Sequence, residues 1–180
     1  MWYNTFLSQR KGNKMHRVFL FGSRDIYGIP DLVVQHLENI LTQTNGEVEF
    51  IVGDAPGIDS AFHKALSSIG AASKTTVYCM EYTRNNSYDL ATKVFSSTYD
   101  PDTKKVQINN GDEVIDTIDN IEKPDDLKYN RQFYEFKDRQ MRNACTFAIC
   151  IWDGKSKGTF TNINVLKAQD KYVYIYRVET

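Results

Sequence analysis

Short apolar runs that end on glycine alternate with helical patterns in the first half of the chain. Residues 17–22 and 48–53 are such runs. Apolar runs of this length are typical of strands that are buried on both faces of a parallel sheet. Apolar residues recur at helical spacing in residues 32–41, and again in residues 58–66. The pattern therefore predicts a β-α-β-α unit at the start of the fold.

Three further strands follow along the chain, at residues 75–80, 146–152 and 172–178, and helical patterns precede and follow the second of these. Strands that alternate with helices need crossover connections, which place the strands parallel to one another. We predict an α/β fold, a Rossmann-like three-layer sandwich with a mostly parallel sheet of about five strands.

The alternation breaks in residues 81–130, where polar residues cluster and acidic residues exceed basic ones. Residues 104–115 alternate around Asn109-Asn110-Gly111, as a β-hairpin would. A structureless loop of this length is unusual in a compact domain, so we predict a hairpin-containing insertion or a lid. Residues 1–16 form an N-terminal extension, and residues 17–180 form one domain.

The composition narrows the classes of function. The 180 residues carry 22 basic and 23 acidic side chains, so no global positive field attracts a polyanion, and a nucleic-acid partner is disfavoured. No apolar stretch is long enough to cross a bilayer. Cys79, Cys145 and Cys150 show neither a disulfide nor a metal-binding spacing. These features predict a cytoplasmic protein with reduced thiols, and we assign it no metal, no cofactor and no membrane partner.

Ligands of doubly wound sheets bind beyond the carboxyl ends of the strands, where three unusual turns are predicted. The first turn is Gly22-Ser23-Arg24. Glycine lets the backbone approach a ligand, serine can donate a hydrogen bond to a phosphate oxygen, and arginine offers a planar charged fork. The alternative is an ordinary tight turn whose Arg24 faces solvent.

The second turn, residues 53–60, has two glycines and a proline directly before a helix. Its amide groups could bind an anion at the positive end of that helix. Asp59 lies in the first helical turn, where its carboxylate could cap the helix or accept a hydrogen bond from a ribose hydroxyl. His63 follows one turn later and is interpreted as a core or surface histidine.

The third turn, residues 152–159, combines glycines with two lysines and two hydroxyl side chains between a strand and a helix. This composition favours a phosphate-binding turn, although it is neither a P-loop nor a dinucleotide fingerprint. Together the three turns favour a phosphorylated ligand. The residues that we predict to bind it are Gly22, Ser23, Arg24, Gly53, Asp54, Ala55, Gly57, Asp59, Asp153, Gly154, Ser156, Gly158 and Thr159.

The motifs resemble those of the SLOG superfamily of Rossmann-like proteins, which includes the LOG phosphoribohydrolases and the DNA-processing protein A family. Phe21-Gly22-Ser23-Arg24 is similar to its opening turn, residues 53–61 to its glycine-rich second motif, and residues 151–159 to its W-D-G-x-S-x-G-T turn. Residues 137–141 are similar to the charged helix that precedes the last motif. The resemblance spans residues 17–178 without the insertion, and it implies a nucleotide-derived ligand and a homodimer.

The LOG phosphoribohydrolases carry a P-G-G-x-G-T-x-x-E signature whose glutamate takes part in cleaving an N-glycosidic bond. Here Gly158-Thr159 matches, but Asn162 stands at the glutamate position and the P-G-G is absent. An amide cannot exchange a proton or carry the charge that an oxocarbenium-like transition state favours. We therefore predict a nucleotide-binding module or sensor. The alternative is a nucleotide N-glycosidase that uses another carboxylate, with Asp54 and Asp59 as candidates.

Other residues on the predicted ligand side keep more than one interpretation. Asp25, Asp138 and Asp153 are further carboxylates that could serve the site. The aromatic residues at the end of the insertion either stack against a base or pack in the core or a dimer contact; they are Tyr129, Phe133, Tyr134 and Phe136.

Overall fold

The computed structural model describes residues 15–81, 88–122 and 131–179, and its strands form one sheet in the order β6-β5-β4-β3-β2-β1-β7-β8. The five strands expected from the sequence pair in parallel within it. They are β1 (His16–Gly22), β2 (Val48–Val52), β3 (Thr75–Met80), β7 (Phe147–Trp152) and β8 (Tyr172–Arg177). The predicted α/β class and mostly parallel sheet are confirmed.

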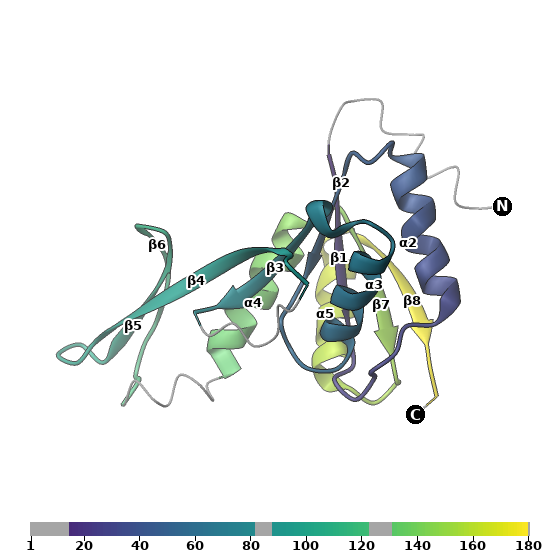
Figure 1. Cartoon of the computed structure of the whole chain (residues 1–180). Coiled ribbons are helices and arrows are strands. Elements are labelled where there is room, and N and C mark those ends of the chain that lie inside the picture. The colour runs from purple at the N-terminus through teal and green to yellow at the C-terminus, as the bar shows by residue number, and fades with distance from the viewer. Residues whose placement is uncertain (1–14, 82–87, 123–130, 180) are drawn as a thin grey trace.

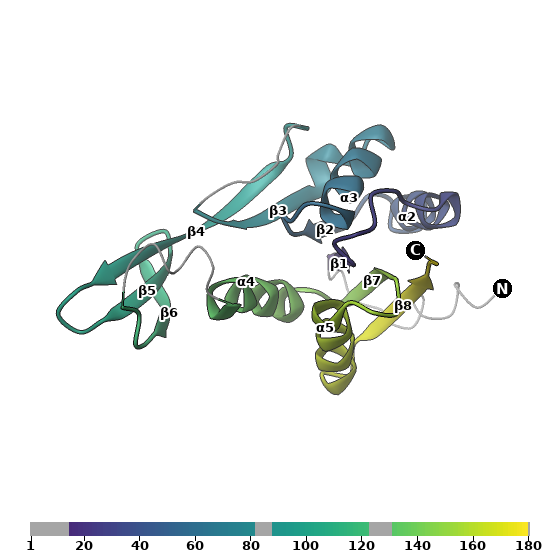
Figure 2. The same ribbon diagram turned by 90° about the horizontal axis from the view of Figure 1, so that it is seen from below.

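Helices cover both faces of the sheet. On one face lie α2 (Asp31–Gln43) and α3 (Ile58–Ser68), and on the other lie α4 (Arg131–Ala144) and α5 (Lys157–Ala168) (Figure 2). A short 3-10 turn, η1 (Ala72–Lys74), leads into β3. Each face has its own buried apolar cluster between helices and strands. The chain therefore forms the predicted three layers. Among the described residues, no helix is long and apolar enough to cross a membrane.

The helices dock through the apolar stripes that the sequence shows. On α2 the stripe includes Val33 and Leu37, and on α3 it includes Phe62 and Leu66, all with no exposed surface. Spacings of three and four residues place such side chains on one face of a helix. Full burial of each of them contributes about 1.5–3 kcal/mol. These stripes hold the helices, and the turns that precede them, against the sheet.

The insertion adds three strands to the sheet, so the expected count of about five was too low. The predicted hairpin is present as β5 (Lys105–Asn110) and β6 (Glu113–Ile118). The strand that was missed is β4 (Ala91–Asp100), which pairs in parallel with β3 and then antiparallel with β5. Only Phe95 is fully buried along β4, so its sequence lacks the apolar run or alternation that marks a strand.

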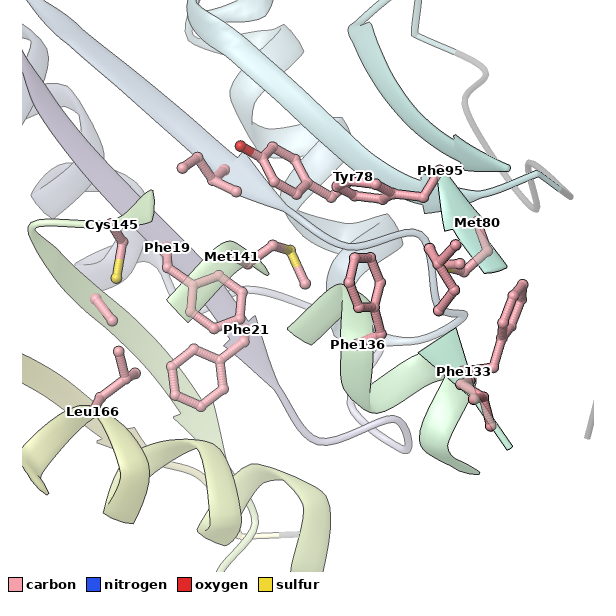
Figure 3. Close-up of a cluster of buried hydrophobic side chains, with 14 of the residues drawn as sticks. Phe19, Phe21, Tyr78, Met80, Phe95, Phe133, Phe136, Met141, Cys145 and Leu166 are labelled. Carbon is pink, nitrogen blue, oxygen red and sulfur yellow. The ribbon is translucent and has the colours of Figure 1, made fainter. Parts of the chain in front are cut away.

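The added strands project from the sheet as an arm and share a core with α4 (Figure 1). Phe95 of β4 packs edge-on against Phe136 of α4, with 5.3 Å between ring centroids. Phe133, Phe136 and Met80 belong to the same cluster (Figure 3). The core-packing interpretation of Phe133 and Phe136 is therefore confirmed, whereas Tyr129 and residues 1–14 of the extension lie outside the described residues.

Glycines allow the turns at the carboxyl ends of the strands to touch one another. A Cβ atom on Gly57 would lie 1.8 Å from the carbonyl oxygen of Arg24, and Gly57 has a φ of 86°. A Cβ atom on Gly22 would lie 2.2 Å from the carbonyl oxygen of Ile151. The turn after β1 is thus in backbone contact with the turn after β2 and with the end of β7. Any other residue at these two positions would force the turns apart.

We predict that Gly57→Ala destabilises the fold by at least about 2 kcal/mol, because it adds a backbone clash to the cost of a positive φ. Gly70→Ala is the control for a positive φ without a clash, since Gly70 has a φ of 74° and no atom lies within 4 Å of the position of its Cβ. It should cost about 1–2 kcal/mol, the price of the conformation alone. Urea unfolding of both variants measures the difference, and equal losses would show that the contact with Arg24 contributes nothing.

Candidate functional site

A cleft of about 690 Å³ lies where the turns after β1, β2 and β7 meet α4 and the first turns of α5. Most of the predicted ligand-binding residues line it: Gly22, Arg24, Gly53, Ala55, Asp59, Asp153, Ser156, Gly158 and Thr159. Ser23, Asp54, Gly57 and Gly154 are not among the lining residues. No residue in the described part of the insertion lines the cleft. The lining includes Arg131, the first residue after the insertion.

Ser23 joins two of the turns to each other. It is fully buried, its amide donates to the carbonyl oxygen of Ile151 at 3.0 Å, and its Oγ accepts from the amide of Asp153 at 3.2 Å. The hydroxyl therefore holds the turn after β1 to the turn after β7. Its place in the motif reflects this connection between turns.

The turn between β7 and α5 is shaped by its own side chains. Asp153 Oδ1 accepts hydrogen bonds from the amides of Lys155 and Ser156, both at 2.8 Å, and these bonds hold the pKa of Asp153 below its usual value. Ser156 caps α5, because its Oγ accepts from Thr159 Oγ1 at 3.0 Å and from the Thr159 amide at 3.5 Å.

Within the described residues, the amides of Lys157 and Gly158 have no acceptor, as is normal for a first helical turn. Both residues line the cleft. The positive end of the α5 dipole and two unpaired donors therefore face the space between the turns. This is the place where an anion would be held.

A buried ion pair connects α4 to the turn after β2. Lys137 Nζ lies 2.6 Å from Asp54 Oδ1, and the two side chains are only 6% and 7% exposed. Burial lowers the pKa of Lys137, but the carboxylates of Asp54, Asp59 and Asp138 outweigh burial and raise it. Removing one partner of such a pair typically costs about 3–5 kcal/mol, since the other charge is left buried and alone. Asp54 thus has a structural partner and does not line the cleft.

Asp59 is the predicted candidate carboxylate that does face the cleft. Its Oδ2 accepts a hydrogen bond from the amide of Ala55 at 3.1 Å, so it braces the turn as well. The missing side chain of Gly53 makes room for it, because a Cβ atom there would lie 2.5 Å from Asp59 Oδ2. Burial raises the pKa of Asp59 to about 6, and the charge of Lys137 opposes this rise only in part.

Helix α4 supplies one wall of the cleft, which the sequence indicated only in part. Tyr134, Lys137, Asp138 and Met141 line it, and their spacing of three to four residues puts them on one helical face. Burial raises the pKa of Asp138. The sequence pointed to Tyr134 and Asp138 as possibilities. The sequence feature that could have identified the whole face is a helical stripe that mixes aromatic, charged and thioether side chains.

Asn162, at the position of the LOG-type glutamate, also lines the cleft and bridges two charged residues. Its Oδ1 accepts from the guanidinium of Arg142, and its Nδ2 donates to Asp138 Oδ2 at 3.4 Å. Arg142 is buried and also donates to Glu135 Oε1 at 2.6 Å. The amide therefore separates a buried cation from a carboxylate and contacts both.

The charges of the cleft are unevenly distributed. Lys155 and Lys157 are exposed where α5 begins and Arg24 is exposed in the turn after β1, and the carboxylates of Asp25 and Asp153 line the cleft in the same two turns. Asp59 and Asp138 are half-buried at the inner end, next to Lys137. An anion is favoured beside the free amides of α5, and a group that donates hydrogen bonds is favoured at the inner end.

The remaining candidate residues have structural surroundings. His63 is fully buried, and its Nε2 donates to the carbonyl oxygen of Gly53 at 2.8 Å, which makes it a core histidine that holds the turn after β2. Cys79, Cys145 and Cys150 are free and buried. Burial raises the pKa of Cys79 and of Cys145 to about 11, so these thiols stay protonated near neutral pH.

Comparison of the chain with protein families, with curated proteins and with solved structures finds no match. The comparisons therefore assign neither a family nor a ligand. The cleft and its chemistry carry the functional inference.

The raised pKa of Asp59 predicts how its charge affects stability. A carboxyl that binds protons more tightly when folded loses its stabilising contribution as pH rises from about 4 to above 6. We expect Asp59→Asn to gain about 1–2 kcal/mol over wild type between pH 4 and pH 8, a value discounted for partial exposure.

Urea unfolding at the two pH values measures this gain. Asp112→Asn, at an exposed position in the turn between β5 and β6, serves as the control and should behave like wild type. A loss of stability at pH 8 in Asp59→Asn would mean that attraction to Lys137 outweighs burial.

Proposed function

We propose that this chain is a binding module or sensor for a nucleotide or nucleotide-derived ligand, with a Rossmann-like fold of the SLOG type. The observation that supports this most is the pairing of a cationic mouth and open helix amides with a hydrogen-bonding inner end in one cleft. The cleft volume of about 690 Å³ falls within the usual range for small-ligand sites.

The phosphate would occupy the mouth of the cleft. There the amides of Lys157 and Gly158 start α5, and the cations Arg24, Lys155 and Lys157 line the same cleft. Backbone amides at a helix N-terminus bind phosphate through hydrogen bonds and through the helix dipole. Arginine adds a planar fork that matches phosphate oxygens. No rearrangement of the turn is needed, because Asp153 and Ser156 already fix its backbone.

The sugar and base would extend toward α4. Phe21 of β1 and Met141 of α4 form apolar parts of the lining, and Tyr134 of α4 lines the same cleft. Aromatic faces stack against bases, and apolar side chains contact the sugar ring. Tyr134 is partly buried and in edge contact with Phe133, which holds its ring in place.

We predict that Gly158→Asp weakens nucleotide binding at least about tenfold while keeping the fold. A carboxylate at the start of α5 suits the helix dipole but repels phosphate. Gly158→Ala is the matched control, because no atom lies near the position of its Cβ, and it should bind within about twofold of wild type.

The measurement is a thermal-shift and calorimetric series with nucleoside mono- and diphosphates, NAD and ADP-ribose. A ligand that binds only the folded state must raise the melting temperature. The proposal fails if no compound of the series does so. It is also contradicted if Gly158→Asp binds like Gly158→Ala.

Hydrolysis of a nucleotide N-glycosidic bond is the second candidate function, and Asp59 is the observation that favours it. Its carboxyl faces the cleft, and its pKa of about 6 suits proton transfer near neutral pH. Asp54 is the weaker candidate, because Lys137 holds its Oδ1 away from the lining. Asn162 provides no acid in the LOG-type position.

If the chain is a hydrolase of this kind, incubation with the same compounds releases a free base that chromatography resolves. The rate should then change with pH around 6, and Asp59→Asn should reduce it about 100-fold or more. Compounds that bind but stay intact identify a binding module. Base release that persists in Asp59→Asn would assign the chemistry to another group.

A further inference from the structure

We infer that the cleft selects ribonucleotides over deoxyribonucleotides, because the carboxylates of Asp59 and Asp138 together accept the hydrogen bonds of a ribose 2′,3′-diol. The inference rests on the proposed nucleotide-binding function and specifies the sugar of its ligand. Three properties of the inner end of the cleft support it: open acceptor atoms, the place of these atoms relative to α5, and the local balance of charge.

The two carboxylates keep open acceptor atoms. Asp59 uses Oδ2 for the amide of Ala55, and Asp138 uses Oδ2 for a long hydrogen bond of 3.4 Å from Asn162. Within the described part of the chain, the Oδ1 atom of each accepts no hydrogen bond. Both residues line the cleft and are half-buried. Acceptors in such a setting gain most from donors that a ligand brings, because water is only partly able to reach them.

Helix α5 sets the distance from the phosphate position to these atoms. Asn162, which contacts Asp138, follows Gly158 by four residues and Lys157 by five, a rise of about 6–7.5 Å along the helix. A phosphate bound to the amides of Lys157 and Gly158 therefore lies more than one helical turn, measured along α5, from Asn162 and the carboxylate that it contacts. In a nucleoside 5′-phosphate the ribose is joined to the phosphate through a single carbon, whereas the base and its amino groups lie farther away. The sugar is the part of the ligand that reaches the carboxylates.

The local charge favours a neutral donor at this end. Asp54, Asp59 and Asp138 lie around Lys137, which is already paired with Asp54. The charge of Arg142 also acts on Asp138, but this guanidinium is bound to Glu135 and Asn162. A phosphate would be repelled there, while hydroxyl groups donate to carboxylates without adding charge. A vicinal diol offers two donors side by side, and the open Oδ1 atoms of the two carboxylates offer one acceptor for each. A deoxyribose leaves one carboxylate without its partner.

The structure of Asn162 supports the same assignment for Asp138. Arg142 holds the amide oxygen of Asn162, so the amide nitrogen is directed toward Asp138. One oxygen of Asp138 is thereby fixed by the protein, and the other is left for the ligand. Asn162 acts as a positioning residue in this arrangement.

Isothermal titration calorimetry at pH 8 tests the inference, because Asp59, whose pKa is about 6, is then ionised. The probes are the 5′-monophosphates of adenosine, guanosine, cytidine and uridine, each with its 2′-deoxy and 3′-deoxy forms. We expect the ribose form to bind about tenfold or more tightly than either deoxy form, the usual effect of losing one hydrogen bond to a charged group.

Variants test whether Asp59 and Asp138 are responsible for the selectivity between ribose and deoxyribose. Asp138→Asn and Asp59→Asn should each weaken the ribose forms and bring the ratio of ribose to deoxyribose affinity to within about threefold. Gly158→Asp should weaken both sugar series alike and leave the ratio unchanged, since it acts on the phosphate. Circular dichroism checks that each variant is folded. If one variant does not fold, the affinity ratios of the wild-type protein and of the other variant decide the test.

The outcomes separate the two proposals. If ribose and deoxyribose forms bind equally well to the wild-type protein, the inference is wrong and the nucleotide-binding function stands. If Asp138→Asn and Asp59→Asn keep the wild-type ratio, the diol does not bind these carboxylates. If neither sugar series binds, the proposed function fails for nucleoside monophosphates and the inference fails with it.

Discussion

The buried ion pair of Lys137 and Asp54 is the interaction on which the geometry of the cleft depends most. It joins a helix that follows the insertion to a turn that precedes it, with 2.6 Å between Nζ and Oδ1 and almost no exposed surface. Pairs of this kind add little net stability compared with apolar packing, but they are costly to break and fix a single arrangement. Here the arrangement places Tyr134, Asp138 and Met141 of α4 opposite the three turns.

Close backbone contacts also fix the geometry of the cleft, by holding its three turns against one another. Gly57 lies against the carbonyl of Arg24, and Gly22 lies against the carbonyl of Ile151. Ser23 is hydrogen-bonded to Ile151 at the end of β7 and to Asp153 at the start of the turn that follows. The turns therefore support one another directly, through backbone contacts and the buried hydroxyl of Ser23. A ligand that binds here meets a preformed surface, which reduces the entropy lost on binding.

The sequence predicted most of the central sheet, because strands buried on both faces are nearly continuous apolar runs. It also indicated the turns that line the cleft, because glycine is needed where backbones touch. It did not show β4, since a strand such as Ala91–Asp100, with one fully buried side chain, resembles an irregular segment. It placed Asp54 and Ser23 in the ligand-binding set because motif residues that hold a site together have the same residue types as those that bind its ligand.

The wall formed by α4 could be predicted only in part for a related reason. Lys137 lies 83 residues from Asp54 in the chain, and no local pattern connects the two. The partner of a buried lysine is decided by which helix crosses which turn, and this depends on how the insertion packs. Phe133 and Phe136 fix that crossing by packing against the insertion strands, so residues outside the cleft determine which face of α4 enters it.

The placement of Asp59 shows how stability and function are related in this fold. An ionised carboxylate in protein surroundings that raise its pKa to about 6 weakens the folded state at neutral pH, although Lys137 compensates for part of this cost. If this residue had only a packing role, asparagine would suit the position better, because its amide oxygen accepts the same hydrogen bond from Ala55 without carrying a charge. A ligand that supplies the missing donors offsets this loss of stability, because its hydrogen bonds to the carboxylate form only in the complex. The same reasoning applies to Asp138, whose pKa burial also raises and whose one oxygen is fixed by Asn162. Two such carboxylates from different helices, facing one cleft, support the proposal that the inner end of this cleft receives a ligand.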